Sequence, residues 1–229
     1  MSVGWTTILI VILWGMVPSQ VLSPAFGQDL RERIRTIDEQ QRRIQTVIAD
    51  FSQRKETAFT REPLISSGVV KFKRPNRILW IYREPEPLEV AFDAQSIWLY
   101  HPGRSSAEKY SLARSNRMAR YFEPLAAIFQ KTFAPLAEEY SITLEGTEAD
   151  HLYHFRLQPR DERTQQPLSR ADLWIDKTSG AILRCKMVEF HRDQWSLEFK
   201  NLQINPPLTD DDLKIRIPPS VRVLEQSLP

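Results

Sequence analysis

The chain has 229 residues, of which 41% are hydrophobic and 26% charged, an ordinary globular composition that suffices for one domain with a sizeable core. Its 31 basic and 29 acidic residues leave a net charge of +2, too weak an excess to indicate nucleic-acid binding. Cys185 is the single cysteine, which excludes an intramolecular disulfide.

The first 27 residues contain no Lys, Arg, Asp or Glu, and Ile8–Val17 is a continuous, mostly apolar run. This run is shorter than the roughly 20 apolar residues of a membrane-spanning helix. Small residues at Ala25 and Gly27 fit a signal-peptide cleavage site. We therefore expect residues 1–27 to be a cleaved secretory signal and residues 28–229 to form a single domain. The alternative is an uncleaved N-terminal anchor, because no Lys or Arg precedes the run.

Residues 29–51 have helical periodicity. Mostly apolar side chains recur at alternating spacings of four and three, and charged residues occupy the opposite face. The recurring positions are Leu30, Ile34, Ile37, Gln41, Ile44, Ile48 and Phe51. This pattern predicts one amphipathic helix whose charged face is solvated.

After Pro63 the pattern becomes that of short strands. Runs rich in β-branched and aromatic residues are separated by turn residues such as Arg74–Asn76 and Asp93–Gln95. The four runs span residues 67–73, 78–82, 88–92 and 97–100. Parallel strands need long crossover connections, so the close spacing predicts an antiparallel meander.

Residues 101–113 are polar and basic, and helical spacing returns between Arg114 and Phe133. Pro124 cannot continue a helix undisturbed, so we expect two short helices here, the second beginning at Pro124. Further strands are expected at residues 140–145, 153–157, 171–176, 181–190, 195–201, 213–217 and 221–224. The order predicts an α+β fold with one curved antiparallel sheet and helices against one face.

Several predicted strands, notably residues 78–82, 88–92 and 96–100, are apolar on both faces. A half-exposed sheet would alternate, so both faces of these strands are expected to be covered. One cover is the helical layer. The other is a second sheet layer or an enclosed hydrophobic cavity, and periodicity alone favours the plain core.

The usual signals of catalysis are missing. There is no nucleophile elbow, zinc-protease motif, C-x-x-C or glycine-rich phosphate loop. His151 and His154 are three apart in a predicted strand, so they point to opposite faces. Asp210–Asp212 is interpreted as a solvated turn or the cap of a short helical turn. The sequence therefore predicts a protein that is not an enzyme and has no cofactor or metal.

A set of motifs extends over most of the chain after residue 27. These are Ala49–Gln53, Gly68, Lys73-Arg74-Pro75-Asn76, Trp80, Pro85 or Pro87, Asp93-Ala94, Trp98-Leu99-Tyr100 and Asp212–Pro219. In this order and spacing they resemble the outer-membrane lipoprotein carrier (LolA) family. Residues 68–100 are the specific part of the match.

The resemblance implies an incomplete antiparallel β-barrel with an N-terminal helix and a lid of short helices, here Met118–Phe133. Barrel and lid would enclose a hydrophobic cavity for the acyl chains of a lipoprotein. The residues then expected to line it are Phe72, Trp80, Tyr82, Phe92, Trp98, Tyr100, Met118, Phe122, Leu125, Ile128 and Phe129.

Arg74 matches the arginine of the family's Lys-Arg-Pro turn, and the resemblance implies that it holds the lid closed by donating to lid backbone carbonyls. A guanidinium suits this role because it has five donors and keeps its charge. From turn position alone, Arg74 is a solvated turn residue. The resemblance further implies a periplasmic monomer that receives acylated lipoprotein or other lipid cargo from an inner-membrane ABC-type release complex. It would pass this cargo to an outer-membrane acceptor.

Two features depart from the family pattern. The usual Asp-Gly turn is Asp93-Ala94, which disfavours a turn with positive φ. A basic run precedes the predicted lid, at Arg104, Lys109, Arg114, Arg117 and Arg120. This run is a solvated face, or it meets an anionic membrane surface, a lipid head group or an acidic partner. The departures leave open a carrier of another lipid or glycolipid, or a periplasmic module that kept the fold with a filled core.

Overall fold

A computed structural model describes residues 24–57, 60–93, 95–111, 129, 132–146, 151–160, 168–189 and 193–226. Within these residues a 12-stranded sheet dominates, with few helices. The elements are α1 (Pro24–Arg43), β1 (Thr46–Glu56), β2 (Leu64–Lys73), β3 (Arg77–Glu84), β4 (Leu88–Phe92), β5 (Ser96–His101), η1 (Pro102–Arg104), β6 (Ser106–Ser111), α3 (Phe133–Glu139), β7 (Tyr140–Gly146), β8 (Leu152–Pro159), β9 (Leu168–Asp176), β10 (Ile182–Glu189), β11 (Gln194–Ile204), η2 (Asp211–Leu213) and β12 (Val223–Gln226).

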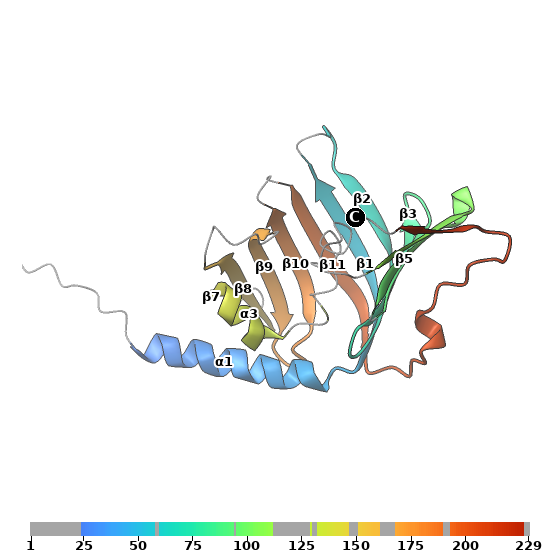
Figure 1. Cartoon of the computed structure of the whole chain (residues 1–229). Coiled ribbons are helices and arrows are strands. Elements are labelled where there is room, and N and C mark those ends of the chain that lie inside the picture. Colours follow the sequence, from blue (N-terminus) through green and yellow to red (C-terminus); the bar gives the residue numbers. More distant parts are fainter. Residues whose placement is uncertain are drawn as a thin grey trace, which may run out of the picture.

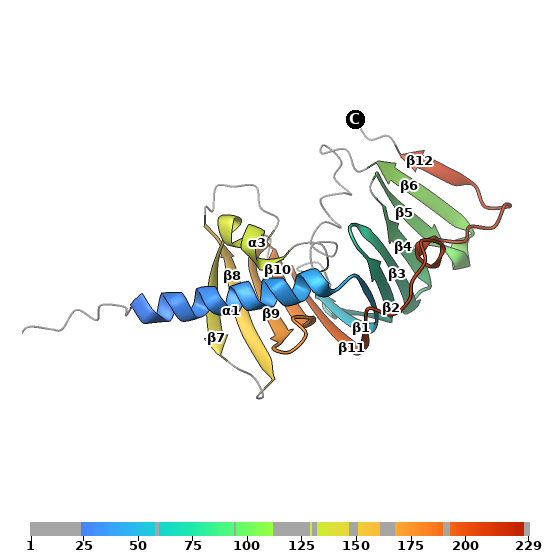
Figure 2. The ribbon, with the colours of Figure 1, turned by 90° about the horizontal axis from the view of Figure 1, so that it is seen from below.

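The strand order is β12-β6-β5-β4-β3-β2-β1-β11-β10-β9-β8-β7. All neighbours are antiparallel except β12, which pairs in parallel with β6. The pairing of β1 with β11 joins the two meanders into one sheet. The sheet is long, open and strongly curved (Figure 1), and α1 lies across the β7 to β10 half with α3 beside it (Figure 2). The predicted single curved sheet is confirmed, and it is antiparallel except for the β12–β6 pair; the predicted helical lid over a hydrophobic cavity stays a prediction.

The curvature creates two faces, set by the alternation of side chains along each strand. On β3, Ile78 and Trp80 join the main hydrophobic cluster, whereas Leu79 and Ile81 join a second cluster on the other side. We call the face that carries Trp80 the inner face and the opposite face the outer face. Helix α1 packs on the inner face through Ile37, which is almost fully buried.

The predicted helix over residues 29–51 is wrong in its last third, residues 44–51. Helix α1 ends at Arg43, and residues 46–56 form β1 between β2 and β11. Ile44, Ile48 and Phe51 fit a helical spacing, yet Val47, Ala49 and Phe51 also alternate and face the core. Because β1 pairs with a strand on each side, its backbone N–H and C=O groups are hydrogen-bonded along its length. These contacts with β2 and β11 favour the strand over the helix.

The meander predicted over residues 67–100 is confirmed, with β4 spanning residues 88–92 as expected. The polar stretch at 101–113 contains a strand that was not predicted, β6, where Ala107 and Tyr110 are buried. The predicted strand at 213–217 is wrong, because Leu213 ends η2 and residues 214–217 pair with none of the described strands.

The predicted helices between residues 114 and 133 fall largely outside the described residues. Within that range the structure describes Phe129, which is helical, and residues 132 and 133 at the start of α3. The predicted signal peptide also falls mostly outside, since the description begins at Pro24 in α1. Among the described helices, none combines the length and the apolar character needed to cross a membrane.

Candidate functional site

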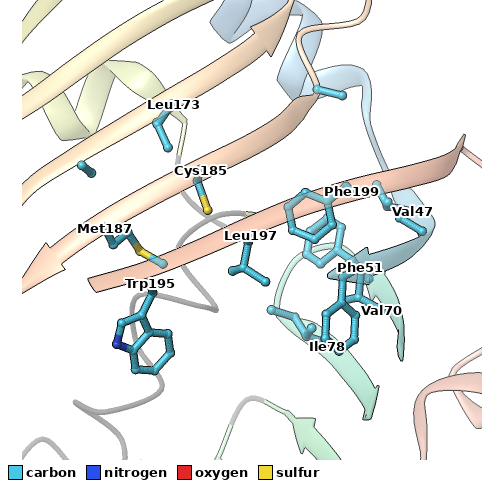
Figure 3. Close-up of a cluster of buried hydrophobic side chains, with 14 of the residues drawn as sticks. Val47, Phe51, Val70, Ile78, Leu173, Cys185, Met187, Trp195, Leu197 and Phe199 are labelled. Carbon is cyan, nitrogen blue, oxygen red and sulfur yellow. The ribbon is translucent and has the colours of Figure 1, made fainter. Parts of the chain in front are cut away.

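The inner face gathers a cluster of aromatic rings from strands that are distant in sequence. Phe129 stacks on Phe72 with ring centroids 5.4 Å apart, and it lies 6.1 Å from Trp80 and 5.5 Å from Phe199. Phe51 meets Trp80 edge-on at 4.8 Å. Such edge and offset contacts are favourable arrangements for aromatic rings. Figure 3 shows Phe51 and Phe199 side by side in this region. We call the following five residues the aromatic cluster: Phe51, Phe72, Trp80, Phe129 and Phe199.

Gly68 lets two strands approach closely beside the aromatic cluster. A Cβ atom at this position would lie 1.9 Å from the carbonyl oxygen of Ile81 and 3.0 Å from Phe51 Cε1. Only a glycine is compatible with this approach. The register of β2 against β3 shifts between Ser67 and Gly68, so the site also marks an irregularity in the ladder.

The described part of the inner face borders a small cavity. A cavity of about 40 Å³ lies between the end of α1, β2 and the β9–β10 turn. Its lining is Gln41, Ile44, Val47, Phe72, Arg74, Phe129, Gly180, Ala181, Ile182 and Leu202. Ligand pockets usually enclose about 300–1,000 Å³. This cavity is well below that size, and Phe129 is part of its lining.

Arg74 lies at the rim of this cavity and joins the β2–β3 turn to the end of α1. Its Nε donates to the carbonyl oxygen of Ile44 at 2.7 Å, and its Nη2 donates to that of Gln41 at 2.8 Å. Its backbone N–H donates to the carbonyl of Gln45 at 2.8 Å. The last carbonyls of a helix have no partner within the helix, so Arg74 caps α1. Burial lowers the pKa of the Arg74 guanidinium, which stays charged at neutral pH.

These contacts are to backbone carbonyls, as the resemblance implied, but the carbonyls belong to the end of α1 and the two residues after it, and not to Met118–Phe133. Most of that predicted lid lies outside the described residues. Arg74 is therefore a bound residue and not a solvated turn residue.

Asp38 makes a second connection between α1 and the helical cover. Its carboxylate is nearly inaccessible and accepts a hydrogen bond from the backbone N–H of Phe133 at 2.6 Å. Thr132, the N-cap of α3, provides no side-chain bond, so Asp38 supplies the missing cap from another helix. Phe133 is fully buried against Phe155, with ring centroids 5.1 Å apart. The start of α3 is thus fixed four residues after Phe129.

The structure divides the predicted cavity residues into three groups. Phe72, Trp80, Phe92 and Phe129 belong to or pack against the inner cluster, together with Tyr82. Tyr82 meets Phe51 at 5.0 Å and donates from its hydroxyl to Gln53 Oε1 at 3.1 Å. Four predicted residues lie outside the described residues: Met118, Phe122, Leu125 and Ile128.

Trp98 and Tyr100 form the third group, and their placement in the cavity is corrected. Trp98 packs in the outer cluster with Leu79, Ala91 and Leu213. Residues two apart on a strand share a face, so Tyr100 also faces outward. The alternation of β5 puts Ile97 and Leu99 on the inner face instead.

The outer cluster explains why β3, β4 and β5 are apolar on both faces. Residues 205–222, which we call the C-terminal strap, cross the outer face and bury Leu213 there. Asp210 anchors the strap through Lys73 at 2.8 Å and Arg77 at 3.5 Å. The C-terminal strap is thus the second cover of these strands, in place of the second sheet layer or enclosed cavity that was expected. A groove of about 480 Å³ remains between Ile215 of the strap and Trp98.

Two members of the aromatic cluster were not predicted from the sequence. Phe51 was assigned to a helix, and Phe199 was assigned to a strand without a role. The signal was the period-two alternation of Trp195, Leu197 and Phe199, all buried. Alternation identifies a buried face, but it does not say which distant strand the face meets.

Titratable groups give no sign of a reaction centre among the described residues. No group of three or more His, Cys, Asp or Glu side chains suited to a metal ion occurs in that part of the chain. His154 and Arg156 both contact Asp172 on the outer face, at 3.1 and 2.9 Å. Burial raises the pKa of the Cys185 thiol to about 12, which suppresses the reactive thiolate.

Fold and site together define an open, curved, mostly antiparallel sheet whose inner face is apolar and aromatic, with α1 and α3 over part of it. Residues 42–216 match the family described as outer membrane lipoprotein carrier protein LolA, and the chain belongs to this family. The family is one of lipoprotein carriers and not of enzymes.

Individual relatives are distant. The chain is 20% identical over 161 residues to an outer-membrane lipoprotein carrier protein of Albidiferax ferrireducens, covering 70% of this chain and 74% of the relative. A crystal structure of an uncharacterized conserved protein from Thermus thermophilus is 11% identical with a TM-score of 0.55, covering 87% of this chain and 100% of that one. The crystal structure of MucB is 17% identical with a TM-score of 0.51, covering 82% of this chain and 63% of that one. The two structures support the fold.

Proposed function

We propose that this protein carries the acyl chains of lipoproteins through the periplasm, from the inner to the outer membrane. The single observation that carries the proposal is the aromatic cluster on the inner face of the sheet. It offers a water-excluded apolar surface on a concave sheet in a chain of the lipoprotein carrier family. Each buried methylene is worth about 0.8 kcal/mol, so exposed acyl chains cannot cross water unassisted.

Ligand entry requires Phe129 to leave its place. The cavity of about 40 Å³ is far too small for an acyl chain, and Phe129 covers Phe72 and Trp80. Displacement of one ring exposes apolar surface that the incoming chain covers again. The free energy lost when Phe129 leaves is nearly regained when the acyl chain binds, so binding is weak enough for a carrier that must also release its cargo.

Arg74 is the proposed latch of this site. Its two side-chain bonds hold the end of α1 against the β2–β3 turn beside Phe129. In the proposed cycle, cargo entry breaks these bonds and release restores them. Met118–Phe133 is the proposed lid, with Phe129 as the part that touches the cluster.

The proposed partners follow from the family. An inner-membrane ABC-type release complex would supply the acylated lipoprotein, and an outer-membrane acceptor would receive it. Residues 1–27 would direct the chain to the periplasm as a cleaved signal peptide. The carrier would act as a monomer without a cofactor.

The small inner cavity favours one competing function, a periplasmic module of the same fold with a permanently filled core. A carrier of another lipid is the second variant of the proposal. The protein is purified after expression with its own leader in a Gram-negative host, and bound lipid is extracted for mass spectrometry. Displacement of a hydrophobic dye by a triacylated lipopeptide gives the affinity.

Matched variants decide between carrier and filled core. Phe129→Ala enlarges the inner space and should strengthen dye and lipopeptide binding several-fold, whereas Trp98→Ala on the outer face should leave binding unchanged. Absence of extractable lipid together with no dye displacement in either protein would establish the filled core. Recovery of a lipid that is not an acylated lipoprotein would establish the other carrier.

A further inference from the structure

The indole N–H of Trp80 is an unpaired donor at the centre of the aromatic cluster. Trp80 is fully buried, and its Nε1 has no hydrogen-bond partner in the part of the chain that the structure describes. Buried Trp N–H groups usually find an acceptor. An orphaned donor forfeits its hydration without a replacement, so it calls for an explanation.

Among the described residues, the surroundings of Trp80 supply rings and no acceptor. Phe51, Phe129 and Phe199 lie 4.8, 6.1 and 6.2 Å away between centroids. The hydroxyl of Tyr82, whose ring stacks at 6.4 Å, is engaged with Gln53. A contact between the N–H and a ring face recovers only a small part of a hydrogen bond. Phenylalanine would pack in such surroundings without the cost.

Water in the small inner cavity does not satisfy Trp80. The cavity is large enough for a water molecule, but its lining includes Gln41 and not Trp80. Gln41 Oε1 is a second buried atom without a partner among the described residues, and a water molecule there would serve it. Among the described residues, Trp80 is thus a buried donor without an acceptor.

We propose that Trp80 Nε1 donates a hydrogen bond to a carbonyl oxygen of the cargo, at the ester or amide that joins an acyl chain to its head group. This inference rests on the proposed function and deepens it, because it gives the site a chemical preference. When Phe129 moves aside, an acyl chain takes its place against Trp80. A hydrocarbon or an ether-linked chain would fill the same space but leave the donor unpaired.

The position of Trp80 also limits how deeply a chain enters. Trp80 pairs with Val70 on β2 and Val90 on β4, both buried, so it sits within an otherwise apolar row. A carbonyl lies at the head-group end of an acyl chain. A bond to Trp80 therefore fixes that end in the middle of β3 and directs the rest of the chain along the inner face.

The test compares two lipids that differ only in the carbonyl. Dipalmitoyl phosphatidylcholine has two ester carbonyls, and its dihexadecyl ether counterpart has none. Both displace a hydrophobic dye from the wild type, from Trp80→Phe and from Trp174→Phe. Trp174 is the matched control, because its indole N–H is also buried without a partner among the described residues but lies on the outer face.

Wild type and Trp174→Phe should prefer the ester lipid about fivefold, the value of one ordinary hydrogen bond. Trp80→Phe should bind both lipids equally. The ratio within one protein is insensitive to general loosening, which weakens both lipids alike. Equal binding by wild type, or a preference that survives in Trp80→Phe, would overturn the inference while leaving the carrier intact. Failure of wild type to bind either lipid or the triacylated lipopeptide would overturn the proposed function together with this inference.

A measurement on the wild type keeps the test decisive if Trp80→Phe does not fold. The indole N–H proton of Trp80 should move downfield in the nuclear magnetic resonance spectrum when the ester lipid binds. The ether lipid should not produce this shift. Equal shifts with both lipids would contradict a bond to the carbonyl.

Discussion

Arg74 donates a hydrogen bond from its Nε to the backbone carbonyl of Ile44 at 2.7 Å, immediately after the end of α1. A second bond to Gln41 makes the contact a two-point clamp between a turn of the sheet and a helix end. A lysine ammonium also has several donors but lacks the rigid planar fork of a guanidinium, so it fits the two carbonyls less well.

Arg74→Leu should fold but lose about 3 kcal/mol of unfolding free energy, because it removes two charged hydrogen bonds, each worth at least about 1.5 kcal/mol. Lipopeptide loading and release should both be impaired, and Arg74→Lys should recover only part of the loss. Urea unfolding gives the stability, and transfer of lipopeptide between vesicles gives the cycle. Transfer at the wild-type rate in Arg74→Leu would remove the latch from the mechanism.

Asp38 fixes α3 to α1, and its removal should loosen the helical cover. Asp38→Ala should lower the unfolding free energy by about 1–2 kcal/mol, the usual cost of a lost helix N-cap. Asp38→Asn keeps an acceptor for the N–H of Phe133 and should recover much of this. Hydrogen exchange at Phe133 should accelerate in Asp38→Ala. Thr36→Ala, an exposed position in the same helix, is the control and should change stability by only about 0.5 kcal/mol or less.

Gly68 has no room for a side chain, and Gly68→Ala should destabilise the protein by about 1–3 kcal/mol through forced displacement of β3. The backbone oxygen of Ile81, which a methyl group would strike, cannot move without breaking the ladder. Gly103→Ala is the matched control, since nothing lies within 4 Å of a Cβ there. Equal unfolding midpoints for the two variants would mean that the strands do not approach as described.

The central meander was predictable because its information is local. Strand and turn residues alternate between 67 and 100 with little ambiguity, and β4 fell where its sequence placed it. The end of α1 was not predictable in this way. Residues 44–51 satisfy a helical and a strand period at once, and the choice depends on the ladders with β2 and β11. Some of those partners are distant in the chain, as the pairing of Asp50 with Lys200 illustrates.

The candidate site was half predictable for a related reason. Phe72 and Trp80, predicted to line a cavity, both lie in the inner apolar cluster, whereas the sequence could not assign Trp98 to a face. When both faces are apolar, side-chain period alone does not say which one meets the helices. The answer lay in the strap, whose Leu213 and Ile215 alternate like a strand because they pack on a sheet face.

Asp210 holds the strap on the outer face, and its contribution should depend on pH. The pKa of the Asp210 carboxyl lies below its ordinary value. The largest cause is the hydrogen bond from Lys73, and the charge of Arg77 adds to it. A depressed folded-state pKa means that stability is present above the unfolded pKa of about 4 and is lost as pH falls through the folded value. Asp210→Asn should therefore melt below wild type at pH 7 and match it at the lower end of the acid range. Salt at about 1 M should shrink the difference at pH 7, because the carboxylate is exposed. A difference that persists unchanged into acid would have to arise from something other than this charge.

The rate at which a reagent labels the Cys185 thiol measures how often the inner core opens to solvent. The thiol is fully buried between Leu173 and Leu197 in the pairing of β9, β10 and β11, and burial raises its pKa to about 12. At about pH 8 almost no thiolate exists in the folded protein, so a maleimide should label Cys185 only after unfolding. An added exposed thiol, Lys200→Cys on β11, should react within minutes and serves as the control. Mass spectrometry of labelled protein over time separates the two sites.

If Cys185 reacts as fast as the added thiol in native buffer, the β10–β11 ladder opens on that timescale and water reaches the inner face there. Slow labelling that accelerates when a lipopeptide is added would instead couple cargo entry to opening of the same ladder.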